Sequence, residues 1–341
     1  MVSRAILVSL AVCASNLAAG IALAIAGFVM IGIGVGAAGT SLLVLLAQQT
    51  DERRRGAAAT IVWMMMIAGF IVTTVTAGHF LEPFSLTRLV AVTSCVSIVA
   101  FALAVMALRG MEPAAANSPR SQGTSRAEMP FSQVLRDVWD EPQARAFTIF
   151  VFTSMLAYSM QDLILEPFAG IAFNLTVGET TKLSGVQHGG VFAGMLLVAI
   201  AGHARFGFGS LRTWTIAGCA ASAVAVVGPA LAGLAGAAWA LKPLVFCLGL
   251  ANGAFAVAAI GTMMGLSGSG GKQREGVRMG LWGAAQAIAF GAGGFVGAAM
   301  ADILRHVVTE PALAYASTFA AEAVLFVVSA VLAQRAIPRT G

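Results

Sequence analysis

The chain has 341 residues, of which 58% are hydrophobic and 10% are charged; its mean hydropathy is +0.87 and its formal net charge is +5. A soluble domain carries about 25% charged residues, so this composition excludes a protein whose whole surface faces water. The positive charge does not indicate a nucleic-acid partner, because the basic residues lie in short segments between apolar runs, where they normally set membrane topology. The composition predicts an all-α, polytopic membrane protein.

A membrane-spanning helix needs about 20 consecutive, mostly apolar residues. The first two runs of this kind form one nearly continuous apolar stretch, which we divide at residues 25–26 because a single helix of that length would greatly exceed the bilayer thickness. The ten predicted spans cover residues 5–24, 27–48, 57–78, 88–109, 146–170, 182–202, 213–234, 240–266, 279–302 and 313–334.

Lysine and arginine are unevenly divided between the two sides of this ten-span arrangement. Of the 20 basic residues, all but Arg88, Lys182, Lys242 and Arg305 fall on one side. Cytoplasmic loops carry the excess of basic residues, so this distribution predicts that both termini are cytoplasmic.

One connection is much longer than the others and separates two groups of helices. Residues 110–145 form a polar stretch whose first half is rich in Pro, Ser, Gly and Ala, which is typical of a flexible linker. Residues 131–139 have the pattern of a short interfacial helix. We therefore expect an N-terminal lobe of four helices (1–109), a cytoplasmic central loop (110–145) and a C-terminal lobe of six helices (146–341), the layout of two-lobed secondary transporters.

Such a transporter has six helices in each lobe, so the first lobe lacks the equivalent of two helices. We expect that the chain is a fragment, or that its start codon is misassigned, rather than a natural ten-helix protein. Its N-terminal apolar run is interpreted as a mature span, since no cleavage site followed by a soluble domain is recognisable.

The segment YSMQDLILEPFAG, at 158–170, concentrates polar residues within a span. Gln161, Asp162 and Glu166 lie in it, and the two carboxylates are four residues apart, which predicts that they share one helical face. A carboxylate in the hydrocarbon region is costly and normally faces the bundle interior or a cavity. Pro167 predicts a break in the helix, as occurs where backbone lines a binding cavity. The alternative is that both acids lie near the outer interface and bond to neighbouring helices.

The next span opens with TKLSGVQHGG, which contains Lys182, Gln187, His188 and Gly189. A neutral imidazole in an apolar niche either ligates a metal, here the magnesium of a chlorophyll, or donates to a neighbouring carbonyl group. The adjacent glycines leave space for a flat macrocycle or for another helix. Lys182 is a candidate partner for Glu166 or Glu179 across the short outer connection.

Glu322 lies near the middle of the last span, where a proton relay or an interhelical partner is the default hypothesis. We find no GxSxG motif, no HExxH motif and no Cys/His nucleophile pair, so the sequence predicts that the chain is not an enzyme.

The strings GVGAAGTSLLVLLA, RRGAAATIVWMMMIAGF, SMQDLILEPFAG and TKLSGVQHGG resemble the PucC family, the bacteriochlorophyll-delivery branch of the major facilitator superfamily. The resemblance implies a major-facilitator-type bundle of which this chain has the third to twelfth helices. It also implies a role in assembling light-harvesting antenna complexes in the inner, intracytoplasmic photosynthetic membrane of a bacterium.

On this resemblance, bacteriochlorophyll is the implied cofactor, and the implied partners are the antenna polypeptides, the machinery of bacteriochlorophyll synthesis and membrane lipid. We hypothesise that His188, with Gln187 and Gly189, binds the pigment, and that no other metal is bound. The alternative function is a proton-coupled secondary transporter of a small molecule, for which the intramembrane acids would serve.

Overall fold

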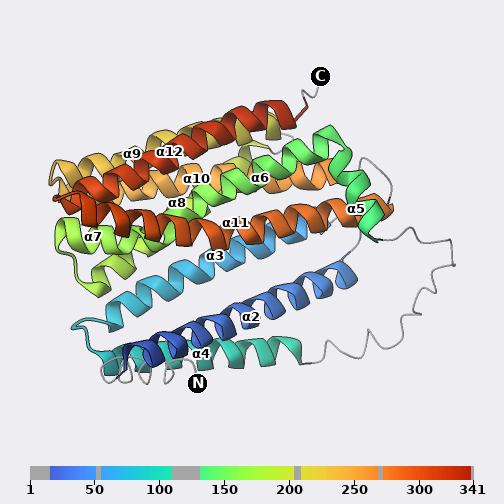
Figure 1. Cartoon of the computed structure of the whole chain (residues 1–341). Helices are drawn as coiled ribbons and strands as arrows, with labels where there is room; N and C mark the ends of the chain where they lie inside the picture. Colours follow the sequence, from blue (N-terminus) through green and yellow to red (C-terminus); the bar gives the residue numbers. More distant parts are fainter. Residues whose placement is uncertain (1–15, 51–54, 110–130, 203–208, 268–271, 339–341) are drawn as a thin grey trace. The chain divides into compact units, whose positions relative to one another are not determined.

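The computed structural model describes residues 16–50, 55–109, 131–202, 209–267 and 272–338. Within these ranges the chain is a set of long helices joined by short turns (Figure 1). Eight of the helices are long and apolar enough to cross a membrane, and a ninth span results if one bent pair is counted. An all-α, polytopic membrane protein is thus confirmed, whereas a major-facilitator type of arrangement stays a prediction.

The predicted spans from residue 57 onward correspond to helices of the structure. They are α3 (Arg55–Phe80), α4 (Leu86–Leu108), α6 (Pro142–Met160) with α7 (Leu165–Phe173), α8 (Val177–Ala201), α9 (Leu211–Leu234), α10 (Ala238–Ser267), α11 (Lys272–Val307) and α12 (Pro311–Ala336).

The predicted division of the first apolar stretch at residues 25–26 is wrong. A single helix, α2 (Leu17–Gln49), runs through this position, and Asn16 caps its first turn by accepting a hydrogen bond from the Ala19 amide at 3.2 Å. The helix contains no proline and no charged residue, so nothing interrupts it. Its apolar section, Leu17–Gly39, is 23 residues long, which matches one bilayer crossing. Residues 5–15 of the first predicted span lie outside the described residues.

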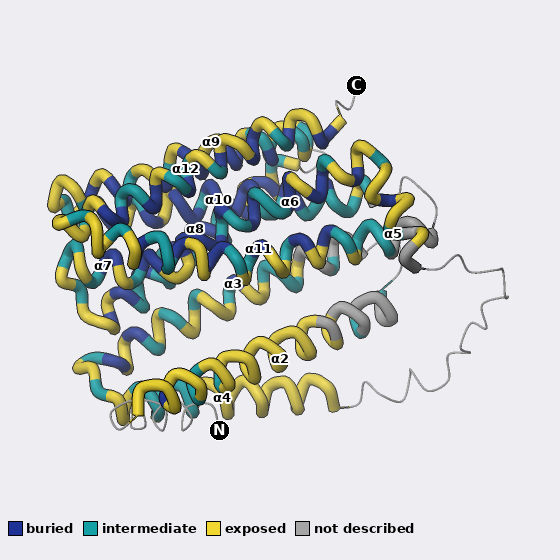
Figure 2. The backbone as a smooth tube through the Cα atoms, in the orientation of Figure 1, coloured by how far each residue is buried: buried dark blue, intermediate teal, exposed yellow. Residues whose placement is uncertain are grey.

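The chain divides into two compact units, one formed by residues 1–59 and 77–129 and the other by residues 60–76 and 130–341. The middle of α3 therefore belongs to the second unit. Buried residues are concentrated in the helices of this second unit, from α6 to α12 (Figure 2). The expected lobes and central loop stay predictions.

The short helix predicted at 131–139, within the central loop, is confirmed as α5 (Phe131–Asp140), on which Val138 is fully buried. The connection to α6 is held by α11, because Arg278 forms an ion pair with Glu141 and the indole nitrogen of Trp282 donates to the carbonyl of Ala144 at 3.5 Å. Residues 110–130 of the central loop lie outside the described residues.

Glycines let α8 and α10 cross with their backbones in contact. A methyl group at Gly190 or Gly194 of α8 would overlap a backbone carbonyl of α10, and one at Gly249 or Gly253 of α10 would overlap a carbonyl of α8. Both helices thus present a pair of small residues four positions apart, which is the arrangement that permits close packing in lipid. Apolar side chains gain little free energy on moving from lipid into a protein interior. This backbone contact is therefore a principal interaction that fixes the position of α8.

A second glycine contact places α11 against the α6–α7 region. Gly293 and Gly297 of α11 lie against the carbonyls of Leu156 and Met160, and the hydroxyl of Ser159 donates to the carbonyl of Ala289 at 3.1 Å. The end of α6 is therefore held tightly on α11 just before its helix breaks.

We predict that Gly190→Leu lowers the free energy of unfolding by about 2 kcal/mol or more, because the new side chain forces α8 and α10 apart. Thermal unfolding in detergent, followed by size-exclusion chromatography, measures this change. Gly189→Ala is the matched control, since nothing lies within 4 Å of a methyl group built there. Equal stability of the two variants would contradict the assigned helix crossing.

Candidate functional site

The span that contains Gln161 and Asp162 is broken, as Pro167 predicted. The helix α6 ends at Met160, a short 3₁₀ turn, η3 (Gln161–Leu163), follows, and α7 begins at Leu165 after a bend of 41°. Proline lacks the amide hydrogen that would bond to the carbonyl four residues earlier, and its ring crowds that carbonyl. That carbonyl belongs to Leu163, so the break precedes the proline by about one turn.

The helix α12 faces this break and brings a buried acid to it. Phe319 of α12 packs edge-to-face on Phe168 of α7, with ring centroids 5.1 Å apart. Glu322 lies one helical turn further along α12, on the same side of the helix as Phe319. Gln161, which precedes Asp162, is fully buried, as is Glu322. Polar side chains from two distant parts of the sequence therefore gather at the level of the break.

Two of these side chains lack hydrogen-bond partners. In the described part of the chain, neither carboxylate oxygen of Glu322 and neither amide atom of Gln161 is hydrogen-bonded. A buried polar group without a partner costs about 1–3 kcal/mol. A position at which a protein tolerates this loss of free energy is a candidate functional position.

The prediction that Asp162 and Glu166 share one helical face is wrong. The break lies between them, so Asp162 belongs to η3 and Glu166 to α7. Asp162 is exposed, whereas Glu166 accepts a hydrogen bond from the Ser184 hydroxyl of α8 at 2.5 Å. The two carboxylates therefore have different surroundings.

His188 lies on the face of α8 that meets the middle of α3. Its Nδ1 atom is 2.7 Å from the carbonyl oxygen of Ser184, and its ring packs edge-to-face on Phe70 with centroids 5.3 Å apart. A carbonyl oxygen only accepts, so this hydrogen bond requires the proton on Nδ1 and leaves the lone pair of Nε2 available. The side chain is half-buried, as a ligand that receives a bound group from one side would be.

The residues beside His188 differ in their surroundings. Gly189 has open space where a side chain would be, whereas Gly190 lies against α10. Gln187 is buried, and its backbone carbonyl contacts Gly249 of α10. Residues two positions apart on a helix are separated by about 200°, so Gln187 and Gly189 lie on nearly opposite sides of α8. Both are about 100° from His188 around the helix, and of these two predicted pigment-site residues Gly189 adjoins open space whereas Gln187 is buried.

The sequence reasoning missed Ser184 and Phe70. Ser184 contacts both candidate regions, since its hydroxyl binds Glu166 and its carbonyl orients His188. Its position one helical turn before His188 was a usable signal, because residues four apart share a helix face. Phe70 had no such signal, since its contact with His188 depends on how α3 packs against α8. The proposed pairing of Lys182 stays a prediction.

Comparison with known proteins identifies the family. The family model described as PUCC protein matches residues 3–340. The chain belongs to the PUCC family. The resemblance predicted from the sequence strings is thus confirmed over nearly the whole chain.

Two relatives illustrate the range of similarity within the family. The Bacteriochlorophyll synthase 44.5 kDa chain of Rhodobacter capsulatus is 51% identical over 320 residues, which cover 94% of this chain and 73% of the relative. Protein PucC of Rhodovulum sulfidophilum is 28% identical over 293 residues, which cover 84% of this chain and 62% of the relative. The chain therefore spans about three fifths to three quarters of the length of these two relatives.

The name of the first relative corrects one prediction. The sequence predicted that the chain is not an enzyme, and this prediction is wrong, because a relative with 51% identity is named as a chain of a synthase. The prediction rested on motifs of soluble hydrolases and metalloproteases, whose absence carries no information about an enzyme that works on a membrane-bound pigment.

We predict that Glu322→Met raises the free energy of unfolding by about 1–2 kcal/mol, because an apolar side chain of similar length removes an unpartnered buried carboxyl group. Thermal unfolding of the purified protein in detergent measures the difference. The partnered carboxylate Glu166, replaced by Met in the same way, is expected to lose stability instead. A destabilised Glu322→Met variant would show that the carboxyl group has a stabilising partner.

Proposed function

We propose that this chain binds bacteriochlorophyll in the membrane through His188 and passes it to light-harvesting antenna polypeptides. The observation that carries the proposal is the orientation of the imidazole. The contact between Nδ1 and the Ser184 carbonyl holds the ring and leaves Nε2 available, and Gly189 leaves space beside it. When bound, the pigment would supply a magnesium ion, and a neutral histidine whose other nitrogen is hydrogen-bonded is suited to bind that ion.

Membership of the PUCC family and the name of the 51% identical relative both support a pigment as the bound molecule. The surroundings of His188 also fit an apolar ring system, because Phe70 already contacts the imidazole and Met64, Ile67 and Ile71 of α3 pack nearby against α8. We place the protein in the photosynthetic inner membrane of a bacterium, where pigment synthesis and antenna assembly meet. Both termini lie in the cytoplasm.

We predict that His188→Leu lowers the ratio of bacteriochlorophyll to protein at least tenfold when the chain is purified in mild detergent from a pigment-producing host. A magnesium–imidazole bond of even 1.4 kcal/mol gives a tenfold change in binding. The ratio is measured by the near-infrared absorption band and by pigment extraction.

His306→Leu is the matched control for this experiment. The Nδ1 atom of His306 contacts the Asp302 carbonyl at 2.8 Å in the same way, but His306 is exposed at the end of α11. Its replacement is expected to leave the bound pigment unchanged. Full pigment in a folded His188→Leu variant, or equal losses in both variants, would contradict His188 as the ligand.

A second candidate function comes from the name of the 51% identical relative, namely that this chain is itself a chain of a bacteriochlorophyll synthase. A deletion strain separates the two functions. Loss of a synthase chain lowers the total bacteriochlorophyll that can be extracted from cells and leaves a precursor in its place. Loss of a delivery protein leaves finished pigment outside the antenna complexes.

A further inference from the structure

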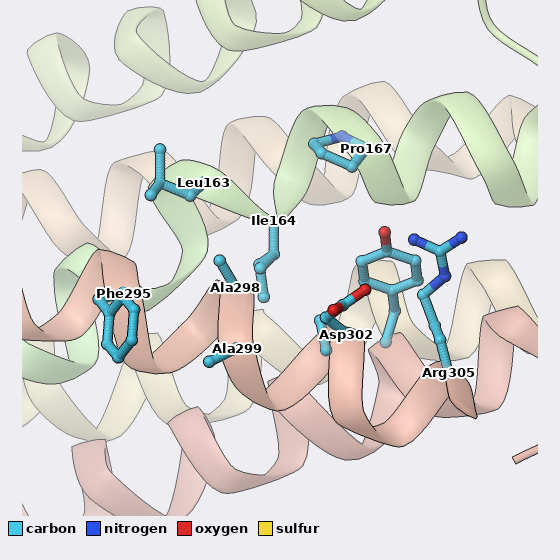
Figure 3. Close-up of a pocket in the computed structure, with 10 residues that line it drawn as sticks. Leu163, Ile164, Pro167, Phe295, Ala298, Ala299, Asp302 and Arg305 are labelled. Atoms are coloured by element: carbon cyan, nitrogen blue, oxygen red, sulfur yellow. The ribbon is translucent and has the colours of Figure 1, made fainter. Parts of the chain in front are cut away.

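A cleft of about 510 Å³ lies beside the helix break (Figure 3). It is bounded by the η3–α7 segment, by the C-terminal part of α11 and by the N-terminal part of α12. Leu163, Ile164 and Pro167 line it from the side of the break, and Phe295, Ala298 and Ala299 line it from α11. His188 is not among its lining residues, so this cleft is separate from the proposed pigment ligand.

The cleft exists because close packing ends at the bend. Before the break, Gly293 and Gly297 hold α11 against the backbone of α6. The 41° bend then turns α7 away from the line of α6, and space opens beside the next two turns of α11. Alanines occupy these turns at Ala298 and Ala299, and their small side chains leave the space unfilled.

The lining changes character along α11. Phe295, Ala298 and Ala299 are apolar, whereas Asp302 and Arg305 lie one to two turns further toward the end of the helix at Val307 (Figure 3). Tyr315 of α12 also lines this part of the cleft. The end of a spanning helix lies at the membrane surface, so the charged part of the cleft lies at the level of lipid headgroups and the apolar part at the level of acyl chains.

The two charged side chains are exposed, and among the described residues the structure gives neither of them a hydrogen-bond or ion-pair partner. Positions three apart on a helix are neighbours, with Cβ atoms about 5–6 Å apart. A single positive group would fit any anionic headgroup. An adjacent anion and cation instead match a headgroup that carries a phosphate and an ammonium group close together.

We propose that this cleft binds a phosphatidylethanolamine molecule. Arg305 donates to the phosphate, the Asp302 carboxylate accepts from the ammonium group, and one acyl chain lies along Phe295, Ala298 and Leu163. Arginine suits the phosphate because its guanidinium group donates two parallel hydrogen bonds. The occupied cleft would fill the space left by the bend and hold the broken helix at one angle. This inference is independent of the pigment site.

The test uses the full chain reconstituted into bilayers that contain equal amounts of phosphatidylethanolamine and phosphatidylglycerol. The protein is then extracted in mild detergent, and the retained lipids are counted by native mass spectrometry. We expect one phosphatidylethanolamine molecule per wild-type chain. Arg305→Gln should lower retention of this lipid about tenfold, as loss of a charge-assisted hydrogen bond implies.

Asp302→Asn is the decisive variant, because it keeps the phosphate contact and removes the ammonium contact. It should lose the preference for phosphatidylethanolamine and retain phosphatidylglycerol at least as well. Lys242→Gln, at an exposed lysine of α10, is the matched control and should retain lipid as the wild type does. All four proteins should elute as monodisperse species with similar thermal stability, since exposed substitutions change stability little.

Three results would overturn the proposal. Equal retention of both lipids by the wild type would indicate only a general lipid shell. An Arg305→Gln variant that behaves as Lys242→Gln does would exclude the phosphate contact. Loss of phosphatidylethanolamine and phosphatidylglycerol together in Arg305→Gln, with no change in Asp302→Asn, would assign the cleft to an anionic headgroup instead.

Discussion

The contact between the backbones of α8 and α10 determines where His188 lies. In a membrane, burial of apolar side chains does not drive helices together as it does in water, so close approach of backbones matters more. Glycines on both helices permit that approach, and a side chain at any of them would separate the pair. One face of α8 is thereby fixed on α10. The opposite face, which bears His188 and Gly185, meets α3 at Phe70 and Thr74.

The same principle sets the position of the helix break. Gly293 and Gly297 fasten α11 to the last turn of α6, and Pro167 prevents the helix from continuing in its original direction. The break therefore occurs where the end of α6 is packed tightly on α11, whereas the following helix, α7, is not. This local constraint opens the cleft lined by Leu163 and Asp302.

Much of the fold could be predicted because its signals are local. Apolar runs of about 20 residues marked the eight spans from residue 57 onward, and Pro167 marked the one among them that is broken. Both signals depend only on residues that are neighbours in the sequence. The first apolar stretch was misassigned for the same reason. Its length indicated two helices, yet nothing in its sequence ends a helix near residue 25, and Asn16 begins one at Leu17.

The candidate site was less predictable because it depends on contacts between distant segments. Glu322 could be recognised as an acid within a span, but its complete burial depends on the packing of α12 against the broken span. The shared face assigned to Asp162 and Glu166 failed because a spacing rule for intact helices does not hold across a break. His188 was found from its glycine neighbours. The open Nε2 atom became evident only with the Ser184 contact in place.

The most direct measurement of the central claim follows pigment from this protein to an acceptor. The purified, pigment-containing chain is mixed with pigment-free antenna polypeptides in detergent, and the near-infrared spectrum is recorded with time after separation of the two components. Our account predicts that bacteriochlorophyll leaves the chain and appears in the antenna band, and that the His188→Leu protein transfers none. Wild-type protein that binds no pigment, or pigment that stays with the chain in the presence of acceptor, would contradict it.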